Sequence, residues 1–222
     1  WLRRLQHRRV WVFFLNLVEV EIKRLVENTK DGKSAIIFGA PRRDNTLIKN
    51  SVYVVENGKI EAIKDKYELP NTGVFDEQRI FTEGELEDCV RIKDINFGLP
   101  ICEDIWEKTV LDNLSKSGAE IIIAINASPF TISKSSERNH IALSRVKETK
   151  LPLIYLNRTG GQDELIFDGT SFALNHDGNR FFCSAEFEEE ISILDFERKN
   201  GKWKGNGNIT KSSSEIERLY KA

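Results

Sequence analysis

Cys102 and Lys66 are the two residues of this chain whose types and surroundings could do chemistry. Cys102 lies in the segment GLPICEDIW (residues 98–106), between an apolar run typical of a strand and an acidic start typical of a helix. The thiolate is the nucleophilic form of cysteine, and a helix N-terminus lowers the pKa of a thiol. A lysine such as Lys66 would stabilise the oxyanion that forms when a carbonyl is attacked. The pair therefore suggests nucleophilic attack on an amide or nitrile carbon.

Each residue also has an ordinary structural explanation. A lone cysteine is more often a buried, apolar-like thiol, and Lys66 by itself would be a solvated lysine like Lys64. Context favours the chemical interpretation, because Cys102 ends a strand at the edge where α/β folds place ligands. Lys66 precedes Leu69-Pro70-Asn71, and a loop restricted by proline can hold the lysine inward.

The elements that must position these residues are strands alternating with helices, together with several hairpins. This order predicts an α/β fold with a mixed sheet. The turns Asn57-Gly58 and Asp177-Gly178 lie between apolar runs and indicate hairpins. Strands are expected at 35–40, 52–55, 60–63, 90–95, 97–101, 121–125, 153–156, 170–174, 180–184 and 191–196, and helices at 17–28, 106–117 and 136–149. Loops are expected at 65–80 and 198–213, and the strand at 35–40 is expected to be fully buried.

Composition excludes several classes of function. The 222 residues are enough for one sizeable domain, and 33 basic against 35 acidic residues give no reason to expect nucleic acid or a membrane as partner. The three cysteines, Cys89, Cys102 and Cys183, are odd in number and far apart. That pattern argues against a disulfide framework or a metal site and favours a reducing, cytoplasmic location. Cys89 and Cys183 are interpreted as packing residues.

Both ends of the chain suggest a longer protein. The sequence starts with Trp1, contains no methionine, and ends inside a helical pattern over 214–222, so we expect an internal fragment. Residues 1–14 carry four arginines and an apolar run that is too short to span a bilayer. We leave residues 1–15 unassigned, with a non-native stretch as the plainest interpretation.

Several segments taken together resemble one known family. The lysine segment KYELPNTGVFDE (66–77) and the cysteine segment PICEDIW (100–106) are followed by NASPF (126–130) and GGQDELIFDG (160–169). GAPRR (39–43) and NSVYV (50–54) fit as well. In this order and spacing, residues 16–222 resemble the amino-terminal glutaminase domain of glutamine-dependent NAD(+) synthetases, a member of the nitrilase superfamily.

The resemblance implies a nitrilase-like four-layer α-β-β-α sandwich with mixed sheets, here without its amino-terminal strands, and a Glu-Lys-Cys triad. Cys102 would attack the side-chain amide of glutamine, Lys66 would hold the oxyanion from close beside the sulfur, and water would cleave the thioester. Ser128 and Lys134 match positions that bind glutamine, and Glu103 is implied to contact the substrate amino group.

Two departures from the family pattern bear on activity. No Phe-Pro-Glu stretch supplies the general-base glutamate, and Glu19, Glu21 and Glu27 follow a surface-type helical pattern. We therefore expect weak glutaminase activity or none from the chain alone. Thr72 stands where the family has a glutamine-contacting tyrosine, and threonine cannot stack on the substrate. Lys134 has a plainer alternative as part of a helix entry capped by a serine at 135 or 136.

The resemblance also implies a division of the chain and a set of partners. Residues 16–197 would form the carbon-nitrogen hydrolase (glutaminase) domain and 198–222 a linker toward an absent synthetase domain. That domain would use ATP and Mg to amidate deamido-NAD, whereas no cofactor or metal is implied for this chain. Expected partners are L-glutamine, a synthetase domain or subunit, and further copies in a homo-oligomer. Two alternatives stay open: a nitrilase-type amidase acting on another small amide, and a truncated, non-catalytic domain retained for assembly.

Overall fold

The computed structural model describes residues 2–222, with side chains from residue 11 onward. The chain divides into two compact units, Trp1–Glu85 and Leu86–Ala222, and each is described by itself. The helices are α1 (Leu2–Asn28), α2 (Lys108–Lys116), α3 (Lys134–Thr149) and α4 (Glu215–Lys221), with short 3-10 helices η1 (Glu77–Arg79) and η2 (Cys102–Ile105). The strands are β1 (Ile36–Asp44), β2 (Leu47–Glu56), β3 (Lys59–Asp65), β4 (Val90–Ile92), β5 (Ile95–Gly98), β6 (Ile121–Asn126), β7 (Leu153–Asn157), β8 (Thr159–Gln162), β9 (Leu165–Asp168), β10 (Phe172–Leu174), β11 (Arg180–Cys183), β12 (Asp195–Lys199) and β13 (Lys202–Asn206).

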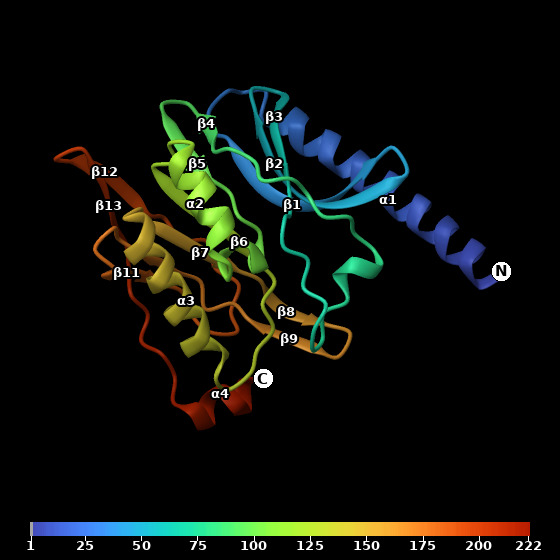
Figure 1. Cartoon of the computed structure of the whole chain (residues 1–222). Coiled ribbons are helices and arrows are strands. Elements are labelled where there is room, and N and C mark those ends of the chain that lie inside the picture. The colour runs from blue at the N-terminus through green and yellow to red at the C-terminus, as the bar shows by residue number, and fades with distance from the viewer. Residues whose placement is uncertain (1) are drawn as a thin grey trace. The chain divides into compact units, whose positions relative to one another are not determined.

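The first unit is built on an antiparallel three-stranded sheet in the order β1-β2-β3. Helix α1 runs along this sheet in Figure 1, with Leu15 and Ile22, about two turns apart, among its buried side chains. The predicted hairpin is confirmed, because Asn57 and Gly58 join β2 to β3 with φ of 53° and 74°. Both residues at positive φ are the signature of the turn type that matches the strand twist. The hairpin leads directly into Lys66.

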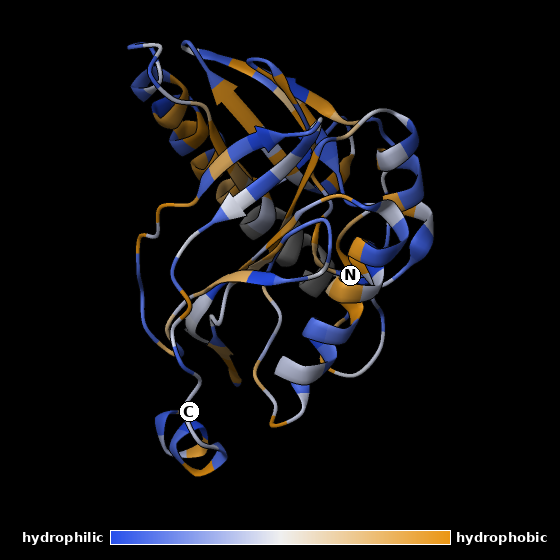
Figure 2. Cartoon of the chain, turned by 90° about the vertical axis from the view of Figure 1, so that its left-hand side faces the viewer, coloured by the Kyte–Doolittle hydropathy of each residue, from blue (hydrophilic) through white to orange (hydrophobic). Residues whose placement is uncertain are grey.

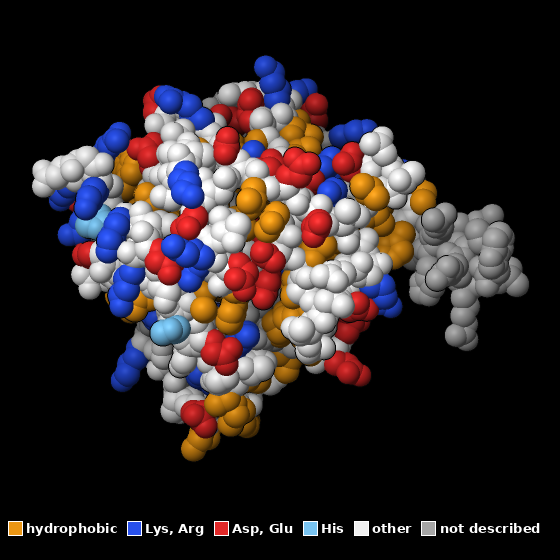
Figure 3. All heavy atoms as spheres, viewed as in Figure 1, with side chains coloured by type: hydrophobic (Ala, Val, Ile, Leu, Met, Phe, Trp, Pro, Cys, Tyr) orange, Lys and Arg blue, Asp and Glu red, His pale blue; other side chains and the backbone are white. Residues whose placement is uncertain are grey.

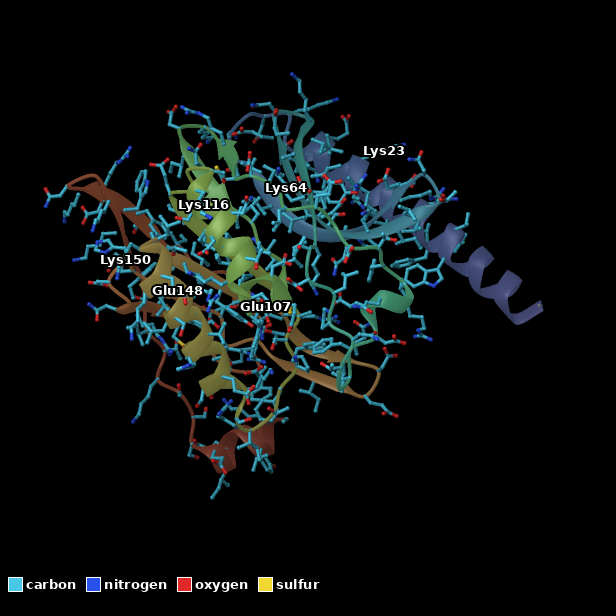
Figure 4. All side chains as sticks on the ribbon, viewed as in Figure 1. Lys23, Lys64, Glu107, Lys116, Glu148 and Lys150 are labelled. Carbon is cyan, nitrogen blue, oxygen red and sulfur yellow. The ribbon has the colours of Figure 1, made fainter. Side chains whose placement is uncertain are left out.

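The second unit is built on a six-stranded sheet in the order β11-β10-β7-β6-β5-β4. Strands β5, β6 and β7 run parallel and the remaining pairs run antiparallel, which confirms the predicted mixed sheet. Helices α2 and α3 lie side by side against it (Figure 1). Glu107 and Lys116 mark the two ends of α2 in Figure 4, with charges that suit the helix dipole.

Some local predictions are wrong. Helix α1 begins at Leu2 rather than at residue 17, and β1 is half-buried rather than fully buried. The strand expected at 191–196 starts only at Asp195, and Ile191 is fully exposed. The reason is the turn at Asn200-Gly201, with φ of 51° and 77°, which pairs β12 with β13. This hairpin replaces part of the loop expected over 198–213.

The helical pattern near the C-terminus is confirmed as α4. Ser214 caps this helix by accepting a hydrogen bond from the Glu217 N–H, and Arg218 pairs with Glu186 at 3.2 Å. Figure 2 shows both hydrophobic and hydrophilic residues on α4, beside the mark C, and Ile216 and Tyr220 are its most exposed apolar side chains. On the face seen in Figure 3, basic and acidic side chains are interspersed. Among the described residues, no helix is long and apolar enough to cross a membrane.

Candidate active site residues

Cys102 occupies a strained turn. Its φ of +48° is in the left-handed region, which costs a residue other than glycine about 1–2 kcal/mol. The residue before it, Ile101, forms a parallel bridge with Ile125, so the turn begins where the chain leaves the sheet. Such a turn after a strand can lift a nucleophile out of the sheet, and the Cys102 side chain is partly exposed. The predicted strand-to-helix elbow is confirmed.

An acidic residue closes this turn. The carboxylate of Asp104 accepts a hydrogen bond of 2.8 Å from the Ile101 N–H, and its side chain is buried. Cys102 is the first residue of η2, so the thiol lies at the N-terminal end of a short helix, as the acidic pattern predicted. Glu103 follows it and is partly exposed. The turn thus presents a thiol and, beside it, a side chain that solvent can reach.

Ser128 is held firmly just beyond the end of β6. Its N–H donates to Asn157 Oδ1 at 2.9 Å, and its carbonyl accepts from Asn157 Nδ2 at 3.3 Å. Arg138 of α3 donates from Nε to Ser128 Oγ at 3.0 Å and from Nη2 to its carbonyl at 2.7 Å. The predicted substrate-binding serine is therefore fixed by two neighbouring side chains in the second unit.

Sequence reasoning missed Arg138 and its partner Asp168, which pair at 2.8 Å with both side chains buried. A signal was present, because Arg138 lies on the buried face of α3 with Ala142 and Val146, four and eight residues further on. A charged residue on such a face requires a partner. Asp168 belongs to the GGQDELIFDG motif (160–169), for which the sequence predicted no role of this residue.

Lys134 is the first helical residue of α3. Its amine lies 4.4 Å from the centre of the Trp106 ring and 3.0 Å from Glu137 Oε2. Trp106 ends the cysteine segment, so this contact joins the Lys134 and Cys102 segments within the second unit. The helix begins after Ser133 rather than after a serine at 135 or 136, which corrects the expected cap. The Ser133 hydroxyl, with Lys134, lowers the pKa of Glu137.

Lys66 follows β3 in the first unit and is almost completely buried, with 1% of its surface exposed. Its amine forms an ion pair with Glu77 at 2.6 Å, from Nζ to Oε1. Lys64, labelled in Figure 4, lies on β3 and is half-buried, so the two lysines differ as the offset from the proline loop predicted. A buried amine paired with a carboxylate is held in one place away from solvent, where its interaction with an oxyanion would be strong.

Glu77 is a third residue that sequence reasoning left without a role. Its Oε2 accepts from Asn50 Nδ2 at 3.4 Å, while the Asn50 carbonyl accepts from the Lys66 N–H at 2.8 Å. The three residues therefore form one hydrogen-bonded group. Its place in the lysine segment, 11 residues after Lys66 in the sequence, was the available signal.

Thr72 lies in the exposed part of the loop between Lys66 and Glu77. Its carbonyl accepts a hydrogen bond of 3.1 Å from the Phe75 N–H, which closes a turn. The carboxylates of α1 named above, at positions 19, 21 and 27, are exposed on the helix, as predicted. Among the residues that the structure describes, no group of three or more His, Cys, Asp and Glu could hold a metal ion.

A family model and several curated proteins match this chain. The model of the carbon-nitrogen hydrolase family matches residues 13–202. A glutamine-dependent NAD(+) synthetase of Rhodobacter capsulatus is 37% identical over 94% of this chain and 38% of its own length. Its counterpart in Acinetobacter baylyi is 38% identical over 70% of this chain and 29% of its own length. The chain thus spans well under half of the length of these relatives.

Solved structures show the same fold. A glutamine-dependent NAD+ synthetase of Acinetobacter baumannii, in complex with ADP, superimposes with a TM-score of 0.85 at 30% identity, over 93% of this chain and 39% of that one. An amidase of Nesterenkonia AN1 from the nitrilase superfamily gives 0.69 at 18% identity, over 77% and 64%. These matches confirm the predicted α/β, nitrilase-like fold.

Proposed function

The chain belongs to the carbon-nitrogen hydrolase family, and we propose that it hydrolyses the side-chain amide of L-glutamine through a thioester on Cys102. The observation that carries this proposal is the strained, partly exposed Cys102 at the start of η2. The names of the curated relatives, all glutamine-dependent synthetases, support glutamine as the amide.

The proposed reaction has two steps. The thiolate of Cys102 attacks the amide carbon, and the carbonyl oxygen becomes an oxyanion that the Lys66 ammonium stabilises. The carbon–nitrogen bond then breaks, the nitrogen takes the proton that the general base removed from the Cys102 thiol and leaves as ammonia, and a thioester remains. Water attacks the thioester, which releases glutamate and restores the thiol. Cys102 and Lys66 are proposed for two of the three roles, and the third, the general base, is the glutamate of the family pattern.

The residues proposed to hold the substrate are Lys134, Glu103, Ser128 and Thr72. Lys134 and Glu103 can meet the carboxylate and the amino group of an amino acid, and Ser128 can hydrogen-bond one of its oxygens. Thr72, in its exposed loop, offers a small hydroxyl in place of an aromatic ring, so we expect weaker glutamine binding than a tyrosine there would give.

We propose that the ammonia serves an ATP- and Mg-dependent amidation of deamido-NAD in the cytoplasm. The support is that the curated relatives are NAD(+) synthetases more than twice as long as the part this chain matches. A synthetase domain or subunit, in a homo-oligomer, is the expected partner. Free thiols at Cys89, Cys102 and Cys183 suit a reducing compartment.

Labelling with a glutamine-like diazo-ketone tests this proposal without requiring turnover. We expect the whole chain to be labelled at Cys102, L-glutamine to protect it, and Cys102→Ala to abolish the labelling. Ammonia release is then measured with glutamine and with acetamide, and the comparison tests which amide is the substrate. Labelling spread equally over the three cysteines would overturn the nucleophile, and protection by simple amides but not by glutamine would favour an amidase.

The general base is tested separately. No glutamate within residues 1–222 matches the family segment that supplies it, so ammonia release by residues 1–222 alone should be slower than by a version extended upstream with that segment. The expected difference is about 10²–10⁴-fold, the usual contribution of general acid–base catalysis. Equal rates in both would place the base within residues 1–222, with Glu77 as the first residue to test. Labelling of Cys102 without turnover would fit the non-catalytic alternative.

A further inference from the structure

All the N–H groups of the Arg138 guanidinium are hydrogen-bonded, although nothing in the reaction requires a buried arginine. A guanidinium has five N–H donors, and the structure gives Arg138 five hydrogen bonds. Nε donates to Ser128 Oγ, Nη1 donates to both oxygens of Asp168, and Nη2 donates to the carbonyls of Ser128 and Pro129. The side chain is 1% exposed and so cannot adjust by moving into solvent.

Asp168 balances the charge of Arg138. It is fully buried, and its two oxygens accept from Arg138 Nη1 at 2.8 and 3.0 Å. The Thr170 hydroxyl donates to Oδ2 at 2.8 Å. Two opposite charges that are hydrogen-bonded and shielded from water have little conformational freedom, because burying either charge without the other would cost free energy. Asp168 therefore aims the guanidinium at Ser128.

The hydrogen bond from Arg138 determines whether the Ser128 hydroxyl acts as a donor or as an acceptor toward other groups. Its oxygen accepts from Arg138 Nε, and the backbone N–H and carbonyl of Ser128 are taken by Asn157 and Arg138. The remaining capacity of the side chain is its O–H proton, together with one lone pair. The buried Tyr155 hydroxyl lies close to it, and the Ser128 side chain acts to lower the pKa of Tyr155, but no hydrogen bond of good geometry joins the two. Ser128 is thus set up as a donor.

We propose that Arg138 is a positioning residue for the substrate, which fixes Ser128 as a hydrogen-bond donor to an oxygen of the bound amino-acid amide. This inference rests on the function proposed above. A purely structural pair would support the unit as a whole and would not act on Ser128 in particular. The two possibilities differ in what they predict for a glutamine-like ligand and for a reagent that carries no glutamine group.

The test uses Arg138→Lys in the whole chain. Lysine keeps a positive charge for Asp168 but has no Nε–H at the place that meets Ser128 Oγ. We expect the concentration of the diazo-ketone that half-saturates Cys102 labelling to rise about five- to tenfold, the effect of losing about one hydrogen bond. Labelling by iodoacetamide, which lacks the amino-acid part, should keep its rate.

Two comparisons make the result specific. Arg145→Lys is the matched control, since Arg145 lies two turns further along α3 and pairs with Glu148 at 3.3 Å. It should leave both labelling reactions unchanged. In a Ser128→Ala background, Arg138→Lys should add no further loss, because the hydroxyl through which it acts is gone.

Additive effects in that double variant, or an equal loss with iodoacetamide, would overturn the proposal in favour of a structural role. If Arg138→Lys does not fold, as judged by urea unfolding, Asp168→Asn replaces it, because the amide keeps one acceptor oxygen and nearly the same volume. Asp168→Asn should also raise the half-saturating concentration of the diazo-ketone, by a smaller factor, and leave the iodoacetamide rate unchanged. An unchanged half-saturating concentration would overturn the proposal. Failure of the unaltered chain to label at Cys102 would instead refute the proposed function.

Discussion

Lys66 and Glu77 form a buried ion pair, 2.6 Å from Nζ to Oε1, in which the lysine is the more deeply buried partner. An ammonium has three N–H donors, and the bond to Glu77 uses one of them. The lysine therefore combines a balanced charge with capacity for further hydrogen bonds. Replacing either partner tests how much of the first unit depends on this balance.

Glu77→Gln should lower the free energy of unfolding by about 2–4 kcal/mol, because it leaves a buried ammonium without its counter-charge. The estimate is reduced from the usual cost of breaking a buried pair because 18% of the Glu77 side chain is exposed. Urea unfolding measures the effect. The control is Asp76→Asn, which breaks the exposed pair of Asp76 with Arg79 and should cost about 0–1 kcal/mol.

A double variant, Lys66→Met with Glu77→Gln, should be more stable than Glu77→Gln alone. Removing both charges removes the unpaired cation, and buried pairs replaced by apolar side chains often lose little stability. A double variant less stable than the single one would mean that the lysine stabilises the unit through other contacts. Its Cys102 should still react with iodoacetamide.

The sequence predicted elements where the pattern was local. The Asn57-Gly58 hairpin, the elbow at Cys102 and the mixed character of the second sheet were predicted correctly, because turn chemistry and apolar runs act over a few residues. The segment around Ile191 shows the opposite case. Its apolar alternation predicted a strand, yet Asn200-Gly201 placed the hairpin later in the chain.

The candidate site was predictable only in part, for a physical reason. Cys102, Lys66 and Ser128 were assigned from motifs, and these assignments stay predictions. The bond from Arg138 to Asp168 spans 30 residues and depends on how α3 packs. No pattern of neighbouring residues in the sequence predicts which carboxylate pairs with a buried arginine. The positive φ of Cys102 is likewise set by the surrounding turn rather than by its residue type.

The buried hydroxyl of Tyr155 gives a prediction about stability. This hydroxyl has no hydrogen-bond partner of good geometry, and the ring stacks on Phe172 with 4.9 Å between centroids. Tyr155→Phe should therefore leave the free energy of unfolding unchanged or raise it by up to about 1 kcal/mol, since an unpaired buried hydroxyl is costly. Tyr220→Phe, at an exposed position, is the control and should change nothing.

The pH dependence of the stability of Tyr155→Phe follows from the direction in which the pKa of Tyr155 is shifted. Burial, and next the Cys102 thiolate, raise the pKa of Tyr155, so the folded state disfavours the tyrosinate. Unfolding then releases a proton above the ordinary tyrosine pKa of about 10, and stability falls as pH rises beyond it. Tyr155→Phe should remove this part of the decline in urea titrations between pH 9 and 11, roughly. An unchanged slope would contradict the assignment.

The three thiols should differ in their reaction with iodoacetamide. Burial raises the pKa of the Cys183 thiol, and the side chain is 2% exposed, so it should react slowest and gain most when pH is raised. Cys89 is partly exposed and its sulfur lies 3.3 Å from the Ser117 carbonyl. Cys102 should react first. Mass spectrometry of the alkylated chain gives the order, and urea-unfolded chain, in which the three should react alike, is the control.

Gly205 tests whether the β12–β13 hairpin is an integral part of the second unit. A Cβ added there would overlap the Phe181 ring, and the Gly205 backbone exchanges two hydrogen bonds with the Asn175 side chain. Because an aromatic ring cannot yield as a flexible side chain can, Gly205→Ala should lower the free energy of unfolding by about 1–3 kcal/mol. Gly161→Ala is the matched control, a strand glycine whose added Cβ would have its nearest neighbour at 3.8 Å. Urea unfolding of both decides the matter: equal, small effects would mean that the hairpin separates from the unit without cost, as a linker would.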